Sequence, residues 1–188
     1  ACRNSILLTL PVSIYVNPVR VAYLGVFGFA AIACFVGAWR ATTVVDDDTR
    51  TGLFALLTLS GTWAGASVGR LLPVEPALQT TFYVLGLVTG FATVGAWLYF
   101  CSAYTGSGYH RRGTVRVGAV ALFLVVVTVK LTNPLHGLYF ATTVQADPFQ
   151  HLAIDLHAIH WVVTGLAYAL SAVGFYLLYE LFDQSHYD

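Results

Sequence analysis

Long apolar runs alternate with short polar segments along the whole chain. They fall at about Val19–Trp39, Gly52–Leu72, Leu78–Cys101, Val115–Leu131 and Leu152–Leu181. About 20 apolar residues in helical form cross the hydrocarbon core of a bilayer, so each run is long enough to cross once. The pattern predicts an all-α fold, a polytopic transmembrane helical bundle of about five spans.

Composition supports a membrane location. Hydrophobic residues make up 57% of the chain and charged residues only 10%. Soluble domains carry about 25% charged residues, so most of this molecule's outside must face lipid. The formal net charge is zero, which gives no electrostatic basis for binding nucleic acid. The lipid bilayer is therefore the first expected partner.

Basic residues near the span ends predict the orientation. The one basic cluster, "HRRGTVR" at 110–116, lies between the third and fourth runs. The positive-inside rule places it in the cytoplasm, with the N-terminus outside and the C-terminus cytoplasmic. The expected division is an N-terminal extracytoplasmic or interfacial segment at 1–18, a transmembrane bundle at 19–182 and a cytoplasmic tail at 183–188.

Ionisable side chains gather at the start of the fifth run, in "FQHLAIDLHAIHWVV". His151 and Asp155 are four residues apart, and His157 and His160 are three apart, so on a helix each pair would share a face. Such groups are costly at membrane depth and often functional. Interfacial or capping roles are favoured here, with metal or haem ligation and proton sensing left open.

Other candidate chemistry is weak. Cys2, Cys34 and Cys101 show no CxxC spacing, and no phosphate loop, GxSxG or HExxH motif occurs, so neither an enzyme nor a cofactor is expected. The aspartates at 46–48 favour a solvated acidic loop over a metal site. A retinal Schiff base needs a lysine inside the bundle, and Lys130, the only lysine, lies at the end of the fourth run.

The stretch "LTNPLHGLYF" at 131–140 ends the fourth run. Pro134 lacks an amide hydrogen and disfavours helical geometry at Asn133, so the helix should stop there. The Asn133 side chain can satisfy freed backbone groups. The aromatic residues that follow are expected to fold back at the interface. A helix stop explains Asn and Pro but leaves His136 unexplained.

The same stretch resembles the T-N-x-L-H-x-L-aromatic signature of the histidine-kinase N-terminal seven-transmembrane sensor domain family. "FALLTLSGTWAGASVGRLL", with Trp63 at its centre, is similar to the family's second helix. "FYVLGLVTGFATVGAWLYFCSAYTG" resembles its third, which ends in an aromatic-rich segment and Y-T-G. The resemblance covers about residues 20–180. The family has seven spans where five fit here, and the chain contains no methionine, even at position 1. A fragment of a longer receptor is favoured over a stand-alone relative.

This resemblance implies a sensory input module of a membrane signal-transduction protein in a two-component system. A stimulus would shift helix packing and pass to a cytoplasmic PAS, GAF or kinase module, in cis or in trans, in a possible homodimer. The expected signalling or ligand-binding residues are Asn133, His136, Trp63, Tyr83, Tyr104 and His160.

Two alternatives remain. One is a haem-binding membrane electron carrier with axial ligands among His136, His157 and His160. The other is a small transporter or scaffold in which polar helix residues line a pathway.

Overall fold

The computed structural model describes residues 18–72, 74–145 and 151–184. The predicted segments 1–18 and 183–188 therefore lie almost wholly outside the described residues. Within the described residues, five helices are long and apolar enough to cross a membrane, which confirms the predicted all-α bundle. These helices are α1 (Pro18–Ala41), α2 (Asp47–Leu71), α3 (Pro76–Tyr104), α4 (Gly113–Leu131) and α6 (Ala158–Gln184).

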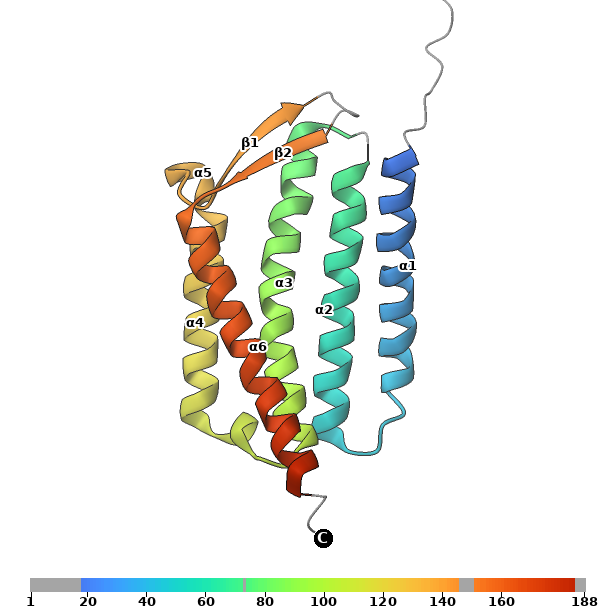
Figure 1. The fold of residues 1–188 in the computed structure, drawn as a ribbon, viewed down its shortest axis with the longest axis vertical. Coiled ribbons are helices and arrows are strands. Elements are labelled where there is room, and N and C mark those ends of the chain that lie inside the picture. The colour runs from blue at the N-terminus through green and yellow to red at the C-terminus, as the bar shows by residue number, and fades with distance from the viewer. Residues whose placement is uncertain (1–17, 73, 146–150, 185–188) are drawn as a thin grey trace, which may run out of the picture.

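The five long helices alternate in direction between two ends of the molecule (Figure 1). Helices α1, α2 and α3 lie side by side, with α2 packed against both neighbours, and α4 and α6 each pack on α3. A one-turn helix α5 (Asn133–His136) and the strands β1 (Phe140–Gln145) and β2 (His151–Leu156) lie at one end, called here the hairpin end. The described chain begins at the hairpin end and finishes at the opposite end.

The predicted fifth helix is wrong at its start. Residues 151–156 form β2, which pairs antiparallel with β1 from Phe140↔Leu156 to Gln145↔His151. Cross-strand hydrogen bonds satisfy this backbone, and α6 begins only at Ala158. Residues four apart in a strand are separated by about 13 Å, so His151 and Asp155 are not the close pair that a helix would make.

Local sequence explains where the helices begin and end. Asp46 precedes α2, and its carboxylate accepts a hydrogen bond from Thr49 N at 2.7 Å. The Thr49 side chain and, to a lesser extent, this backbone hydrogen bond lower the pKa of Asp46. Pro76 stands in the first turn of α3, where its missing N–H costs nothing. After α3, Gly106 and Gly108 have φ of +66° and +71°, a left-handed backbone that glycine adopts without strain.

Small residues let the helices approach closely. The buried positions of α2 are all glycine or alanine: Gly52, Gly61, Ala64, Ala66 and Gly69. A Cβ at Gly61 would lie 3.1 Å from the Phe35 ring of α1. Large apolar residues such as Phe29 and Val117 are instead 76% and 71% exposed, as lipid-facing residues should be. Close backbone contact is the main source of helix association in lipid.

Trp97 of α3 contacts helix α6. The Trp97 indole donates a hydrogen bond to Ser171 O at 3.1 Å and stacks obliquely on Phe175 at 5.0 Å between centroids. A Cβ at Gly174 would lie 2.3 Å from Trp97 Nε1, so only glycine leaves room for the indole there. This contact fixes α6 across α3 near the middle of the bundle.

Candidate functional site

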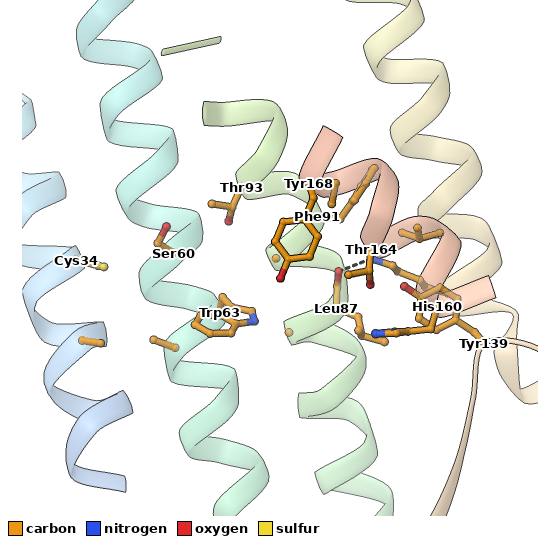
Figure 2. A pocket seen from close by; sticks show the side chains of 17 residues that line it. Cys34, Ser60, Trp63, Leu87, Phe91, Thr93, Tyr139, His160, Thr164 and Tyr168 are labelled. Carbon is orange, nitrogen blue, oxygen red and sulfur yellow. Dashed lines mark hydrogen bonds between the residues drawn. The ribbon is translucent and has the colours of Figure 1, made fainter. Parts of the chain in front are cut away.

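A cleft of about 620 Å³ opens between the helices (Figure 2). All five long helices contribute to its walls, and Tyr139, just before β1, closes its hairpin end. From the hairpin end it extends along α3 and α6 as far as Cys34 of α1 and Tyr168 of α6. Volumes of 300–1,000 Å³ are typical of small-molecule sites.

Among the residues that the structure describes, Lys130 is the only charged one that lines this cleft. Its side chain leaves the last turn of α4 and is 97% buried, since its exposed fraction is 3%. Nζ donates a hydrogen bond to Leu87 O at 2.7 Å and lies 4.9 Å from the centroid of the Phe91 ring. The sequence places Lys130 correctly at the end of the fourth helix. From this position the side chain is long enough to turn inward, and it lies inside the bundle.

His160 and Tyr139 lie beside each other at the same end of the cleft, with ring centroids 5.3 Å apart (Figure 2). His160 Nδ1 is buried and is the one such side-chain atom without a hydrogen-bond partner in the described part of the chain. Burial, with Tyr83 nearby, raises the pKa of Tyr139 to about 12, so its phenol stays neutral. The neutral Tyr139 hydroxyl is therefore not a counter-ion for Lys130. Lys130 Nζ lies 5.7 Å from the centroid of the Tyr139 ring.

Trp63 projects from α2 into the cleft opposite His160 (Figure 2). It packs edge-on against Phe27 of α1 at 5.9 Å between centroids. A Cβ at Gly90 of α3 would lie 3.2 Å from Trp63 Cδ1, so glycine lets the indole lie against α3. Trp63 thus connects α2 to both α1 and α3, so a change in its position would affect all three helices.

Asn133 organises the turn that follows α4 and does not line the cleft. Its Oδ1 accepts hydrogen bonds from Tyr139 N at 2.9 Å and Phe140 N at 3.2 Å. Its Nδ2 donates to Phe140 O at 2.9 Å. The side chain is buried, and every one of these partners is backbone. The predicted capping role agrees with this geometry, but the capped groups belong to the start of β1.

His136 lies in the same turn and is exposed. Its Nδ1 accepts a hydrogen bond from Leu138 N at 3.0 Å, and its Nε2 lies 3.2 Å from the Thr132 hydroxyl. His157 Nδ1 bonds to Gly137 O at 2.7 Å. The T-N-x-L-H motif therefore builds a turn with hydrogen-bonded histidines. These contacts give no support to haem ligation by His136 or His157.

The remaining predicted residues lie at opposite ends of the bundle. Tyr83 packs edge-on against Phe140 at 4.9 Å between centroids, which supports the hairpin. Tyr104 is 52% exposed at the far end of α3 and stacks on Phe100. Of the six predicted residues, the structure brings only Trp63 and His160 into the cleft.

A second polar cluster ties α2 to the loop after α3, at the end opposite the hairpin. The Asp48 carboxylate accepts hydrogen bonds from Arg111 Nε at 3.0 Å and lies 3.2 Å from His110 Nε2. His110 Nδ1 is 3.0 Å from the Ser102 hydroxyl, and the His110 side chain is 5% exposed. The expected solvated acidic loop is therefore wrong for Asp48, which lies in the first turn of α2.

Replacing Asp48 with alanine should loosen this loop. Arg111 and His110 would lose their shared acceptor, so trypsin cleavage at 111–112 in inverted membrane vesicles should rise several-fold. Asp47→Ala is the matched control, because the Asp47 side chain is 84% exposed and its ion pair is with Arg50 of the same helix. Equal cleavage of the two variants would show that Asp48 does not restrain the loop.

Lys130 and Phe91 are among the cleft residues that the sequence analysis missed. A single lysine in a chain of 188 residues, next to a membrane span, was the available signal. Nothing in the sequence marks Phe91 as a cleft residue, since an aromatic residue in a bundle ordinarily packs against its neighbours. The described residues contain no group of three or more metal-ligating side chains.

Comparison with known families gives one match. The family model described as the N-terminal 7TM region of histidine kinase matches residues 22–187. No curated protein and no solved structure matches the chain. The family is a sensor region and not a catalytic domain, which agrees with the absence of kinase motifs from the sequence.

Proposed function

The chain belongs to the family of N-terminal 7TM regions of histidine kinases, and we propose that it is a membrane-embedded sensory input module. In this role it passes a stimulus by helix repacking to a cytoplasmic PAS, GAF or kinase module. Such a module acts in cis or in trans, and a homodimer is one possible form of the assembly.

The observation that carries the proposal is the cleft lined by all five long helices. An occupant that binds one helix arrangement better than another shifts the population toward it. Because α6 crosses α3 and runs to the end of the bundle opposite the hairpin, a shift of α6 would reach that end. Small helix displacements of this kind are a common form of switching.

The proposed orientation has the hairpin end outside and the opposite end in the cytoplasm. The cluster Arg111, Arg112 and Arg116 lies at the end opposite the hairpin, together with Arg40 and Arg50. The positive-inside rule favours the cytoplasm for that end. The cleft then opens in the outer half of the bundle, and α6 leads inward toward the output module.

Filling the cleft should change signal output. Thr164 lines the cleft from α6, and Thr164→Leu adds apolar volume there without adding charge. We expect the output of a receptor that contains this module to lose its response or become fixed in one state. The measurement is autophosphorylation of the attached kinase in membrane vesicles.

Ala169→Leu is the matched control, since Ala169 lies on the same helix, is exposed and does not line the cleft. It should leave the output unchanged. Both proteins must first reach the membrane in equal amounts, as judged by a C-terminal tag. Unchanged output from both would contradict a sensory role for the cleft.

The transporter alternative has less support from the geometry. Thr89 and Thr93, polar residues near the middle of α3, donate their hydroxyl hydrogens to carbonyl groups of their own helix. They therefore do not present a continuous set of free polar groups along a pathway.

A further inference from the structure

We propose that the cleft binds an amphiphile with one carboxylate, which lies against Lys130 while the apolar chain follows α3 and α6 toward the middle of the bundle. The inference rests on the proposed sensory function and names the ligand class of the same site. Three observations among the described residues support it. Lys130 is a buried cation without a counter-ion, His160 Nδ1 nearby is buried without a hydrogen-bond partner, and the rest of the cleft is mainly apolar.

Lys130 has no anionic partner within the described part of the chain. No described carboxylate lies within ion-pair distance of Nζ, and no aspartate or glutamate lines the cleft. Buried lysines normally pair, because a charge removed from water is destabilising unless another charge or several hydrogen bonds offset the loss. An incoming carboxylate would supply that partner.

The partners that Lys130 does have leave room for one more. An ammonium group carries three N–H donors, and the Leu87 carbonyl accepts one of them. The Phe91 and Tyr139 rings add cation–π attraction, which stabilises the charge without using the remaining donors in conventional hydrogen bonds. A carboxylate has two oxygens able to accept them.

His160 Nδ1 marks the same end of the cleft as a polar site. It is buried, it has no partner among the described residues, and its ring lies against Tyr139. When Nδ1 carries the ring proton it can donate to a carboxylate oxygen. Lys130 and His160 approach the hairpin end of the cleft from different helices, so a headgroup there would join α4 to α6.

Beyond the headgroup end the cleft suits an apolar chain. Its walls there are formed by groups such as Ala30, Ala167 and Tyr168, and none of the described residues that line this part is charged. Lys130 and His160 are close to helix ends at the hairpin, whereas Cys34 and Tyr168 are farther along their helices. This gradient matches an amphiphile that enters from the leaflet on the hairpin side with its headgroup near the interface.

Other ligand classes fit less well. A phosphate monoester would bring close to two charges to one cation, whereas phosphate sites usually gather several donors. A protonated retinal Schiff base on Lys130 would itself need a carboxylate counter-ion, and none lines the cleft. A singly charged carboxylate requires only the groups that are present.

The test uses the full-length protein in lipid nanodiscs and two matched photoreactive probes. One is dodecanoate with a diazirine on its chain, and the other is the corresponding dodecanol. We expect the carboxylate probe to label peptides of the cleft at concentrations roughly 30-fold below those needed by the alcohol. Unlabelled dodecanoate should compete, and dodecanol should not.

Variants then test the headgroup contact. Lys130→Met keeps side-chain length but removes the charge, and should weaken carboxylate labelling by roughly 30-fold or more, while Lys130→Arg should retain most of it. The comparison of the two probes on the unmodified protein does not depend on whether a variant folds. Equal labelling by both probes, or undiminished labelling of a folded Lys130→Met, would overturn the inference.

The two proposals fail in different ways. If Thr164→Leu alters kinase output but the carboxylate and alcohol probes label the cleft equally well, the cleft is sensory and the proposed ligand class is wrong. If the carboxylate probe binds at Lys130 and output never responds to dodecanoate or to Thr164→Leu, the ligand site stands and the sensory role falls.

Discussion

Replacing Asn133 with alanine is expected to cause one of the largest losses of stability available in this chain. Three backbone groups, the N–H of Tyr139 and both the N–H and carbonyl of Phe140, would lose their partner inside a buried turn. An unsatisfied buried polar group costs about 1–3 kcal/mol, so the total is on the order of 3 kcal/mol or more. Thermal unfolding in detergent measures this loss.

Two neighbours in the same turn serve as controls for Asn133→Ala. Leu135 is 87% exposed, so Leu135→Ala should change stability by less than about 0.5 kcal/mol. His136→Ala removes one acceptor for the Leu138 amide at an exposed position, where water can replace it, so a loss below about 1 kcal/mol is expected. A loss for Asn133→Ala no larger than these would show that the turn does not depend on its side chain.

The second large effect is expected from Gly52→Ala in the contact between α2 and α3. A Cβ at Gly52 would lie 2.8 Å from Phe100 Cα and 2.9 Å from Tyr99 Cδ1. Because the first of these atoms is backbone, no side-chain rotation relieves the clash and the helices must separate. Overpacking of this kind costs about 1–3 kcal/mol, and the measurement is again thermal unfolding in detergent.

Gly65→Ala on the same helix should have the opposite sign. Nothing lies within 4 Å of a Cβ built at Gly65, so the substitution meets open space. Alanine is favoured over glycine inside a helix by roughly 1 kcal/mol, so stability should rise or stay equal. A destabilisation equal to that of Gly52→Ala would mean that general helix effects, and not the α2–α3 contact, govern both positions.

Gly52→Ala is also expected to affect the loop after α3, at the end of the bundle opposite the hairpin. The Tyr99 hydroxyl lies 3.3 Å from the Asp48 carboxylate, which also binds Arg111. Separation of α2 from α3 would therefore pull on the loop that follows α3. Gly52→Ala should consequently expose the same tryptic sites that Asp48→Ala exposes. A clash confined to the surroundings of Gly52 would leave this cleavage unchanged.

The turn shows how a sequence motif differs from a functional site. Asn133 and His136 stand out in the sequence because polar residues are rare there, and the structure gives both a set of hydrogen bonds within the turn. Their effect on signalling remains a prediction. Their place in the fold is to hold Tyr139 at the hairpin end of the cleft, where its ring meets His160.

The sequence by itself determined the spans, because about 20 consecutive apolar residues have few stable arrangements other than a membrane helix. It also determined that the fourth span ends near Leu131, since Pro134 disfavours a continuous helix, although residues 133–136 still form the single helical turn α5. The order of the motifs was enough to identify the family, which the match to residues 22–187 confirms.

Only the tertiary structure decided which polar groups meet. Residues 151–156 became a strand because the segment at 140–145 was available to pair with it, a nonlocal condition that no helical periodicity reveals. Asp48 is paired, although still partly exposed, because His110 and Arg111 lie beside it. Lys130 turned into the bundle because Leu87 O and the Phe91 ring receive it there, and the direction of a long, flexible side chain depends on such neighbours.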